Sequence, residues 1–501
     1  MGANGDQRGD RPNILLIVSD QERQRDWLPP EVRLPAHERL LGEGLEYRRW
    51  FTHSSPCSPS RATIMTGRYV PQHGVPDNVI HMNHTPLDPA IATVGRTLRD
   101  GGYRSSYIGK WHLSYGAHPD MEAYGYSDWE GNDLHFMGWA GTGAHFDPII
   151  AENAAHWLRT NGTSLSQPWF LTVALVNPHD VMWFPIDQAW YQEQRADEVD
   201  FIKKLLASAQ WKEGDPIPTF QQDYEEIFTE LPANFGDDLH TKPEAHRQWR
   251  WDQQHGAWGW IDPDDPKQWM RALDYYVKLH RFGDENLGRV LDALDDSGAA
   301  GDTVVIYTSD HGDMCGSHGL RSKGPFAYQE IMNVPCYVRA PGITEAGTVT
   351  EALGSHADIT STICSLAGVE PADEVRGVDH TPVWRDPSTR ARDHVMFAQD
   401  SAHTMNIRNT RYALRGIFDG RHKYVRYYGV GGGKPNDDLH GIPSAKLFDA
   451  DADFDDHDHE LYDLQEDPGE LVNLAMDRGR RHDVREWFDR LRAVEAEELL
   501  P

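Results

Sequence analysis

The amino-acid sequence predicts an α/β protein in which a mostly parallel central sheet is flanked by helices. Four short segments, at residues 13–18, 103–108, 169–176 and 303–307, have the composition of strands, and three of them are almost entirely apolar. Such runs are typical of strands that are buried on both faces of a parallel sheet. Each segment ends in polar residues, and ligands of open α/β sheets bind beyond the carboxyl ends of the strands. We therefore expect a functional site at that edge.

The first predicted strand, Asn13 to Val18, is followed by Ser19-Asp20-Gln21. Asp20 is thereby placed at a strand end, where it could hold a metal ion. An aspartate at this position is also a common helix cap, so Asp20 alone does not decide between the two roles.

Residues 54–61, with the sequence Ser-Ser-Pro-Cys-Ser-Pro-Ser-Arg, place Cys57 where a proline-rich loop changes into a short predicted helix. Ser58 or Ser60 is available as the N-cap, and Gly67 ends the helix. Free N–H groups and aligned peptide dipoles stabilise an anion at a helix start, so a reactive group at Cys57 would suit a negatively charged substrate. The alternative is an inert, buried cysteine in a turn.

The second and third predicted strands deliver cationic and imidazole side chains to the same edge. A helix at 91–100 precedes the second strand, which leads to Lys110 and His112, and the third strand leads to His179. Each of these could be a solvated or structural residue in a chain with 26 histidines. Together they repeat one arrangement, a hydrophobic strand with a polar end.

Residues 181–268 interrupt this pattern with a charged, tryptophan-rich region. We interpret it as an irregular and helical lid insertion over the site. Its aromatic side chains could line a pocket for an apolar or cationic leaving group, or simply pack within the lid. They are Trp183, Trp190, Trp211, Trp249, Trp251, Trp258 and Trp260.

A long helical pattern at 269–294 leads to the fourth strand, which ends in Asp310-His311-Gly312-Asp313. Two carboxylates, Asp20 and Asp310, would then meet at one sheet edge, where they repel each other unless a cation lies between them. Lys323 follows shortly after this cluster.

The last part of the chain, residues 391–501, is expected to form a smaller α+β domain beside a catalytic domain at 1–390. Residues 404–427 contain a hairpin pattern around Asp419-Gly420, and a terminal helix is predicted at 481–499.

Composition narrows the class of protein. The chain has 501 residues and a formal net charge of −31. This charge disfavours nucleic acid and anionic polymers as ligands, and it favours a small anionic ester as the substrate, bound in a locally positive pocket. Four cysteines, at 57, 315, 336 and 364, show no disulfide or CxxC pattern, and the N-terminus lacks an apolar signal stretch. We expect a cytoplasmic protein without membrane segments, since no run approaches the roughly 18 apolar residues of a membrane span.

The motif Cys57-x-Pro59-Ser60-Arg61 resembles the signature of the type I sulfatases, in which the cysteine is oxidised to formylglycine. The Asp-His-Gly at 310, the Lys-Gly at 323 and the Glu-Leu-Tyr-Asp-Leu at 460 are similar to further motifs of that family. The resemblance covers nearly the whole chain except the tryptophan-rich insertion. It implies an alkaline phosphatase-like fold.

Carried over residue by residue, the resemblance implies a site with one divalent metal ion. Its ligands would be Asp20, Gln21, the modified Cys57, Asp310 and His311. Calcium is expected, with manganese or zinc as alternatives.

The remaining residues of the implied site act on the nucleophile and the ester. Arg61 and Lys110 would brace the formylglycine hydrate, with His112 close by, while His179 and Lys323 would bind the ester and its leaving oxygen. One hydroxyl of the hydrate, ionised by the metal, would attack sulfur, and loss of a proton from the other would expel sulfate.

Two departures from the family pattern leave the transferred group open. Many sulfatases show Asp-Asp at the first strand end and Asp-Asn at the second, whereas this chain has Asp20-Gln21 and Asp310-His311. This pair resembles phosphonate monoester and phosphodiester hydrolases of the superfamily, and the glutamine also resembles choline sulfatase.

The expected reaction is hydrolysis of a small sulfate monoester to an alcohol and inorganic sulfate. A phosphonate monoester or phosphodiester hydrolase on the same site is the alternative, and a non-catalytic anion-binding protein with an unmodified Cys57 is a further one. The implied partner during maturation is a formylglycine-generating enzyme, and a homo-oligomeric state stays open.

Overall fold

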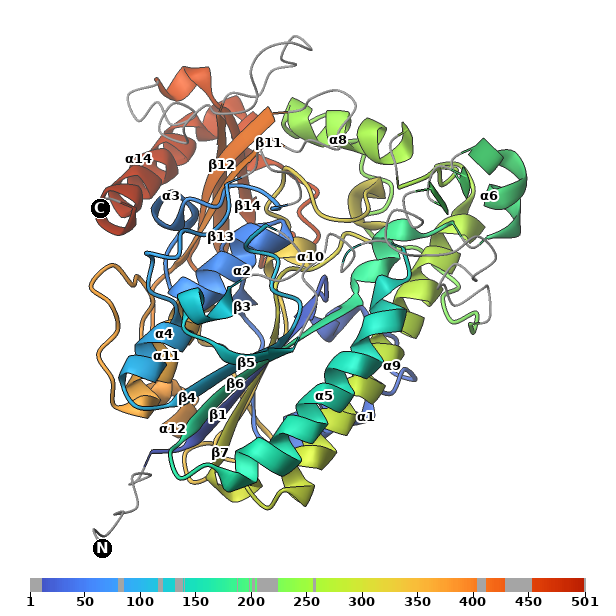
Figure 1. The fold of residues 1–501 in the computed structure, drawn as a ribbon. Coiled ribbons are helices and arrows are strands. Elements are labelled where there is room, and N and C mark those ends of the chain that lie inside the picture. Colours follow the sequence, from blue (N-terminus) through green and yellow to red (C-terminus); the bar gives the residue numbers. More distant parts are fainter. Residues whose placement is uncertain are drawn as a thin grey trace, which may run out of the picture.

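The structure, a computed structural model, is built around one large sheet with helices on both faces (Figure 1). The structure describes residues 11–79, 85–115, 120–130, 138, 140–186, 188–197, 199–200, 203–204, 224–255, 258–402, 411–428 and 453–499. Within these residues the large sheet has eight strands, in the order β5-β4-β6-β1-β7-β8-β2-β9.

Five neighbouring strands of this sheet run parallel to one another. They are β5 (Ser127–Glu130), β4 (Arg104–Gly109), β6 (Trp169–Pro178), β1 (Asn13–Asp20) and β7 (Thr303–Ser309). Next to β7 lies the antiparallel strand β8 (Cys336–Arg339), followed by β2 (Leu45–Tyr47) and β9 (Thr348–Thr350), which pair in parallel with each other. The predicted mostly parallel sheet is confirmed.

Strand β1 separates two layers of the hydrophobic core. Ile14, Leu16 and Val18 pack into one layer, and Leu15 and Ile17 pack into the other, because successive side chains of a strand point to opposite faces. Figure 1 shows the helices that cover these layers. One set is α2 (Cys57–Thr66), α4 (Val94–Asp100), α11 (Ala357–Ala367) and α12 (Thr381–Arg385); the other is α1 (Pro35–Glu43), α5 (Thr142–Ser164) and α9 (Pro266–Asp296).

The four predicted strands coincide with β1, β4, β6 and β7, and the helical pattern at 269–294 lies within α9. Helix α5 was not predicted, since Pro148 lies inside it and its sequence mixes glycine and threonine into the apolar pattern. The strands β2 and β9 were also missed because they have only three residues each.

A separate antiparallel sheet forms the C-terminal part of the fold. Its strands are β11 (Val395–Ala402), β12 (Arg411–Phe418), β13 (His422–Tyr428) and β14 (Asp458–Asp463), in that order. The predicted hairpin turn at Asp419-Gly420 joins β12 to β13, and Gly420 has a φ of 97°, which favours glycine. Helix α14 (Arg481–Glu498), the predicted terminal helix, packs on this sheet. The domain boundary at residue 390 stays a prediction.

The described part of the tryptophan-rich region contains the 3-10 turn His179–Trp183 and the helices α6 (Ala189–Gln194) and α8 (Glu244–His255). Trp183, Trp249 and Trp258 are buried in a core cluster that also contains Phe397 and Leu414 of the C-terminal sheet. These three tryptophans therefore serve in packing, which is one of the two roles that we considered for them from the sequence. Trp211 lies outside the described residues.

Shorter elements complete the structure: β3 (Trp50–Phe51) paired with β10 (Gly354–Ser355), and the helices α3 (Val70–His73) and α10 (Gln329–Met332). Cys57, Cys315, Cys336 and Cys364 are all buried and unpaired. None of the helices in the described part of the chain combines the length and apolar composition of a membrane span.

Candidate active site

The carboxyl ends of β1 and β7 bring Asp20 and Asp310 side by side. Ser19 of β1 pairs in register with Ser309 of β7, and the backbone N–H of Asp310 donates to the Ser19 carbonyl over 3.2 Å. Two carboxylates that are 290 residues apart in the sequence thereby share one edge of the sheet.

Helix α2 begins at Cys57 itself, with Pro56 as the N-cap, so the prediction of Ser58 or Ser60 as the cap was wrong. Both serine hydroxyls are engaged elsewhere: Ser58 donates to the His112 carbonyl over 2.6 Å, and Ser60 donates to the Asp310 carbonyl over 2.5 Å. These bonds attach the helix start to two strand ends. The helix ends at Gly67, which has a φ of 65°, as predicted.

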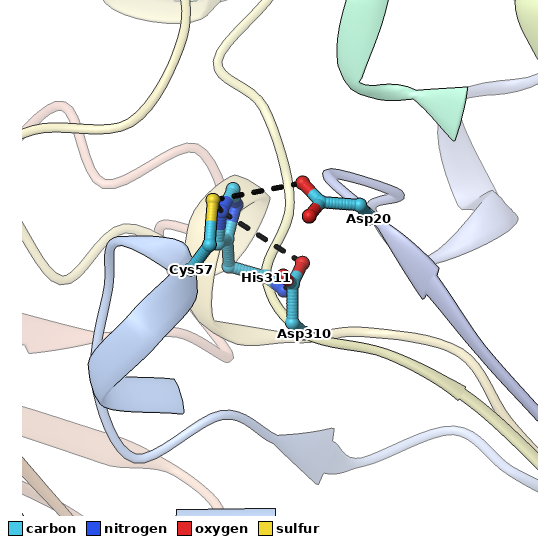
Figure 2. A group of neighbouring side chains, drawn as sticks. All are labelled: Asp20, Cys57, Asp310 and His311. Carbon is cyan, nitrogen blue, oxygen red and sulfur yellow. Dashed lines mark hydrogen bonds and ion pairs between the residues drawn. The ribbon is translucent and has the colours of Figure 1, made fainter. Parts of the chain in front are cut away.

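Figure 2 shows the four side chains that meet at this point: Asp20, Cys57, Asp310 and His311. Their ligand atoms all lie within 4.8 Å of one another, and all four side chains are buried. The Cys57 Sγ lies 3.7 Å from Asp20 Oδ1 and 3.3 Å from His311 Nε2.

The two carboxylates divide their oxygens between this cluster and two buried cations. Arg61 donates from Nη2 to Asp20 Oδ2 and from Nε to Asp310 Oδ2, each over 2.9 Å. Lys110 Nζ forms an ion pair with Asp20 Oδ2 at 2.7 Å. The Oδ1 atoms lie toward the cluster, since Asp20 Oδ1 faces Cys57 and Asp310 Oδ1 lies 3.7 Å from His311 Nε2.

The imidazole of His311 is held in one tautomer. Its Nδ1 lies 2.9 Å from the Gly312 carbonyl, which can only accept, so Nδ1 carries the proton and Nε2 offers a lone pair. Two carboxylate oxygens, one imidazole nitrogen and the side chain of residue 57 thus converge, which is a donor set that fits a divalent cation.

Burial and charge act on the two acids in different ways. Burial raises the pKa of Asp20, but the positive charges of Lys110 and Arg61 outweigh it and hold that pKa well below its usual value. Burial and the charge of Asp20 raise the pKa of Asp310 to about 7. The arrangement is that of two carboxylates in one site, of which one stays ionised more readily than the other.

Gln21, predicted as a metal ligand, has a left-handed backbone with a φ of 70°. Its Nε2 donates to Asp313 Oδ2 over 2.5 Å, and its Oε1 accepts from Lys323 Nζ over 2.5 Å. Lys323 is buried, and its other contacts are His179 Nε2 at 3.2 Å and Met182 Sδ at 3.8 Å. In the described part of the chain, Lys323 therefore forms no ion pair with a carboxylate.

Two histidines lie beside these cations. Burial, Lys323 and Lys110 hold the pKa of His179 well below its usual value, so its imidazole is neutral in the substrate-free protein. Burial, Lys110 and Arg61 do the same for the pKa of His112, whose backbone carbonyl accepts from Ser58.

The tryptophan-rich region reaches the Lys323 loop directly. Arg321 donates from Nη1 to the Phe184 carbonyl over 2.6 Å and from Nη2 to the Gln253 carbonyl over 2.8 Å. A Cβ atom at Gly324 would collide with the indole of Trp249, so only glycine allows this close approach.

Two residues of the site were not assigned a role from the sequence. Asn78 accepts from the backbone N–H of Ser58 in the first turn of α2 over 3.0 Å, and no sequence signal pointed to it. Asp313 accepts from Gln21 and stood in the predicted strand-end cluster, which was the available signal.

Comparisons with known proteins agree with this geometry. The family model described as Sulfatase matches residues 12–369, and a model described as N-sulphoglucosamine sulphohydrolase, C-terminal, matches residues 316–440. The uncharacterized sulfatase YidJ of Escherichia coli K12 is 26% identical over 506 residues, covering 96% of this chain and 88% of that protein.

Two solved structures share the fold. A 2-O GAG sulfatase aligns with a TM-score of 0.73 and 21% identity, covering 97% of this chain and 92% of its own. The phosphonate monoester hydrolase of Agrobacterium radiobacter aligns with a TM-score of 0.66 and 22% identity, covering 97% and 96%. The alkaline phosphatase-like fold is thereby established. Because the Sulfatase model spans more than half of the chain, the protein belongs to the sulfatase family of sulfuric ester hydrolases.

Proposed function

We propose that this protein hydrolyses a small sulfate monoester to an alcohol and inorganic sulfate, using one divalent metal ion and a formylglycine formed from Cys57. The observation that carries the proposal is the position of Cys57. It lies at the start of a helix, within 4.8 Å of two carboxylates and an imidazole. A buried ammonium, Lys323, lies nearby without a carboxylate partner among the described residues.

The metal ligands would be Asp20, Asp310, His311, Gln21 and the modified residue 57. Calcium is our first choice because carboxylate and amide oxygens dominate the set, and the His311 nitrogen also admits manganese or zinc. When bound, such an ion favours an ionised oxygen nucleophile near neutral pH. The inward Oδ1 atoms of the two aspartates and the free lone pair of His311 would hold it.

Formylglycine differs from cysteine because its aldehyde carbon can add water and so carry two hydroxyl groups. Arg61 and Lys110 are close enough to Cys57 to stabilise negative charge there, and they already neutralise Asp20. Both therefore keep the carboxylates from repelling an incoming anion.

Lys323 and His179 would bind the ester. A buried ammonium paired only with neutral acceptors retains its charge for a sulfuryl oxygen. His179, whose Nε2 lies 3.2 Å from Lys323 Nζ, would bind the leaving oxygen and protonate it, while Lys323 keeps its charge. We propose His112 as a neutral neighbour that shapes this pocket, and residues 181–268 as the lid over it.

The alternative is hydrolysis of a phosphonate monoester or phosphodiester on the same site. Gln21 and His311 favour it, since they resemble the pattern of such enzymes, and a phosphonate monoester hydrolase shares the fold. Rates on 4-nitrophenyl sulfate and on 4-nitrophenyl phenylphosphonate separate the two. A tenfold preference for the phosphonate, about 1.4 kcal/mol in the barrier, would overturn the sulfate assignment.

A third reading is an anion-binding protein that keeps its thiol. Mass spectrometry of the peptide that contains Cys57, from protein made together with a formylglycine-generating enzyme, decides this. We expect the aldehyde or its hydrate, and a wholly unmodified thiol would contradict the proposed maturation.

A further inference from the structure

Asp313 is a buried carboxylate that uses both of its oxygens. It is 1% exposed, and its Oδ2 accepts from Gln21 Nε2 over 2.5 Å. Its Oδ1 accepts from the backbone N–H groups of Cys315 and Ser322, over 2.7 Å and 3.2 Å. One side chain therefore joins the end of β1 to the loop that carries Lys323.

The contacts of Gln21 determine which way its amide points. A carboxylate can only accept, so the amide nitrogen of Gln21 must face Asp313. An ammonium can only donate, so the amide oxygen must face Lys323, which lies 2.5 Å away. The two ends of the amide are thus specified by partners of opposite character.

We propose that Asp313 is a positioning residue that holds the amide of Gln21 with its oxygen toward Lys323. The benefit follows from charge: a neutral oxygen orients the ammonium without cancelling its charge, so Lys323 stays available to a substrate anion. The bond from Ser322 to Asp313 also fixes the backbone beside Lys323, at a residue with a φ of 59°. The catalytic consequence rests on the proposed function, whereas the amide orientation does not.

Asp313→Asn tests the orientation with little change in shape. The new side chain keeps an oxygen for the N–H groups of Cys315 and Ser322, but it places an NH2 group against that of Gln21. The amide of Gln21 must then turn, which directs its own NH2 group at the ammonium of Lys323.

Gln21→Glu gives the complementary change. In the natural background, the new carboxylate at position 21 faces the carboxylate of Asp313 and the two repel each other. In the Asp313→Asn background, the carboxylate at position 21 accepts from the new NH2 group and still offers an oxygen to Lys323. The double variant has the same net charge as the natural protein. Each substitution should therefore correct the defect of the other.

The measurements are kcat/KM on the better of the two aryl esters and the unfolding temperature of the metal-free protein. Each single variant should lower kcat/KM by roughly 10- to 100-fold, as for other residues that orient a site. The double variant should recover most of that loss. Gln21→Glu should lower the unfolding temperature in the natural background and raise it in Asp313→Asn. Asp274→Asn, at a buried carboxylate on α9 that accepts from Ile227 and Phe228, is the control and should show no such dependence on residue 21.

If Gln21→Glu changes the unfolding temperature equally in both backgrounds, Asp313 does not orient Gln21 and the proposal is wrong. If the two positions are coupled in stability but neither ester is hydrolysed by the natural protein, the orientation is supported and the proposed function fails instead. Titration of the metal-free variants with Ca²⁺ adds a third readout, in which both single variants should bind more weakly than the double variant.

Discussion

Arg61 Nη2 donates to Asp20 Oδ2 over 2.9 Å between side chains that are 2% and 0% exposed. The same guanidinium reaches Asp310 through Nε, so one buried cation neutralises both strand-end carboxylates. A planar group with several donors can do this, whereas the single ammonium of lysine cannot reach both partners in the same way.

Arg61→Gln should therefore lower the free energy of unfolding by about 3 to 5 kcal/mol, because it takes one of two cations from Asp20 and the guanidinium partner from Asp310, both of them buried. Urea unfolding measures the effect. Arg99→Gln is the matched control: its pair with Glu122 is 34% and 64% exposed, and its loss should cost less than about 1 kcal/mol. Equal effects for the two substitutions would contradict the bridging role of Arg61.

Cys57→Ala should reduce kcat by about 10⁴-fold or more, on the scale seen when a nucleophile is removed. The substitution deletes only a sulfur atom from a buried position, so the fold should be retained. Cys364→Ala in α11, another buried cysteine, is the control and should keep full activity. Activity that survives in Cys57→Ala would rule out the proposed nucleophile.

The strand ends of this site could be predicted because strands that are buried in a parallel sheet have short, almost entirely apolar sequences. The run at 13–18 points to Asp20 and the run at 303–307 points to Asp310, and parallel topology then brings them to one edge. The start of α2 could not be predicted with the same success. Ser58 and Ser60 have the composition of helix caps, yet tertiary partners at His112 and Asp310 occupy their hydroxyls.

The orientation of individual side chains could not be predicted from the sequence. Asp313 accepts from Gln21 and from Ser322, and both of these residues have a left-handed backbone. Neither is a glycine, which is the residue that usually marks such a conformation in a sequence. The bridging of Asp20 and Asp310 by Arg61 likewise depends on how α2 sits against the sheet. These features follow from packing and not from local composition.

Lys323→Met and Lys110→Met should differ in their effect on stability, and only the loss of Lys110 should lower it. Lys323 has no carboxylate partner among the described residues, so replacing a buried, uncompensated charge should leave stability unchanged or raise it. Lys110 pairs with Asp20 at 2.7 Å, so its loss should destabilise the fold. Both should lower kcat/KM, by roughly 10²- to 10³-fold. Thermal unfolding checks the sign, and a clear loss of stability in Lys323→Met would contradict the assignment of its charge to substrate binding.

Removal of the proposed metal should weaken both activity and stability. A ligand that binds only the folded state at a hundred times its dissociation constant adds about 2.7 kcal/mol to the free energy of unfolding. Treatment with a chelator should lower the unfolding temperature, and Ca²⁺ should restore it. In Asp310→Asn the added ion should restore less. An unfolding temperature that responds to neither chelator nor Ca²⁺ would mean that no structural cation binds among Asp20, Asp310 and His311.

A second cluster of buried charged residues is centred on His37 of α1. Its Nδ1 lies 2.6 Å from Asp284 Oδ1, and its Nε2 lies 3.1 Å from Glu22 Oε1 and 3.0 Å from the Tyr307 hydroxyl. Burial disfavours the charged imidazole, but Glu22 and Asp284 outweigh it and raise the pKa of His37 to about 9. The folded state therefore binds a proton that the unfolded chain releases at lower pH.

This predicts a loss of stability in mild alkali. Because the folded pKa lies above the ordinary value of 6.5, the contribution of His37 is complete below pH 6.5 and disappears as pH rises through about 9. The free energy of unfolding should fall by about 3 kcal/mol across that range. Asp147, Asp180 and Asp310, whose pKa burial raises to about 7, also titrate near its lower end, so the comparison with His37→Gln isolates the effect. His37→Gln should be less stable at pH 6 and lack the decline, whereas His482→Gln, at an 81% exposed side chain, should keep it. Parallel curves for the natural protein and His37→Gln between pH 7 and 9 would show that the imidazole is not held in its charged form.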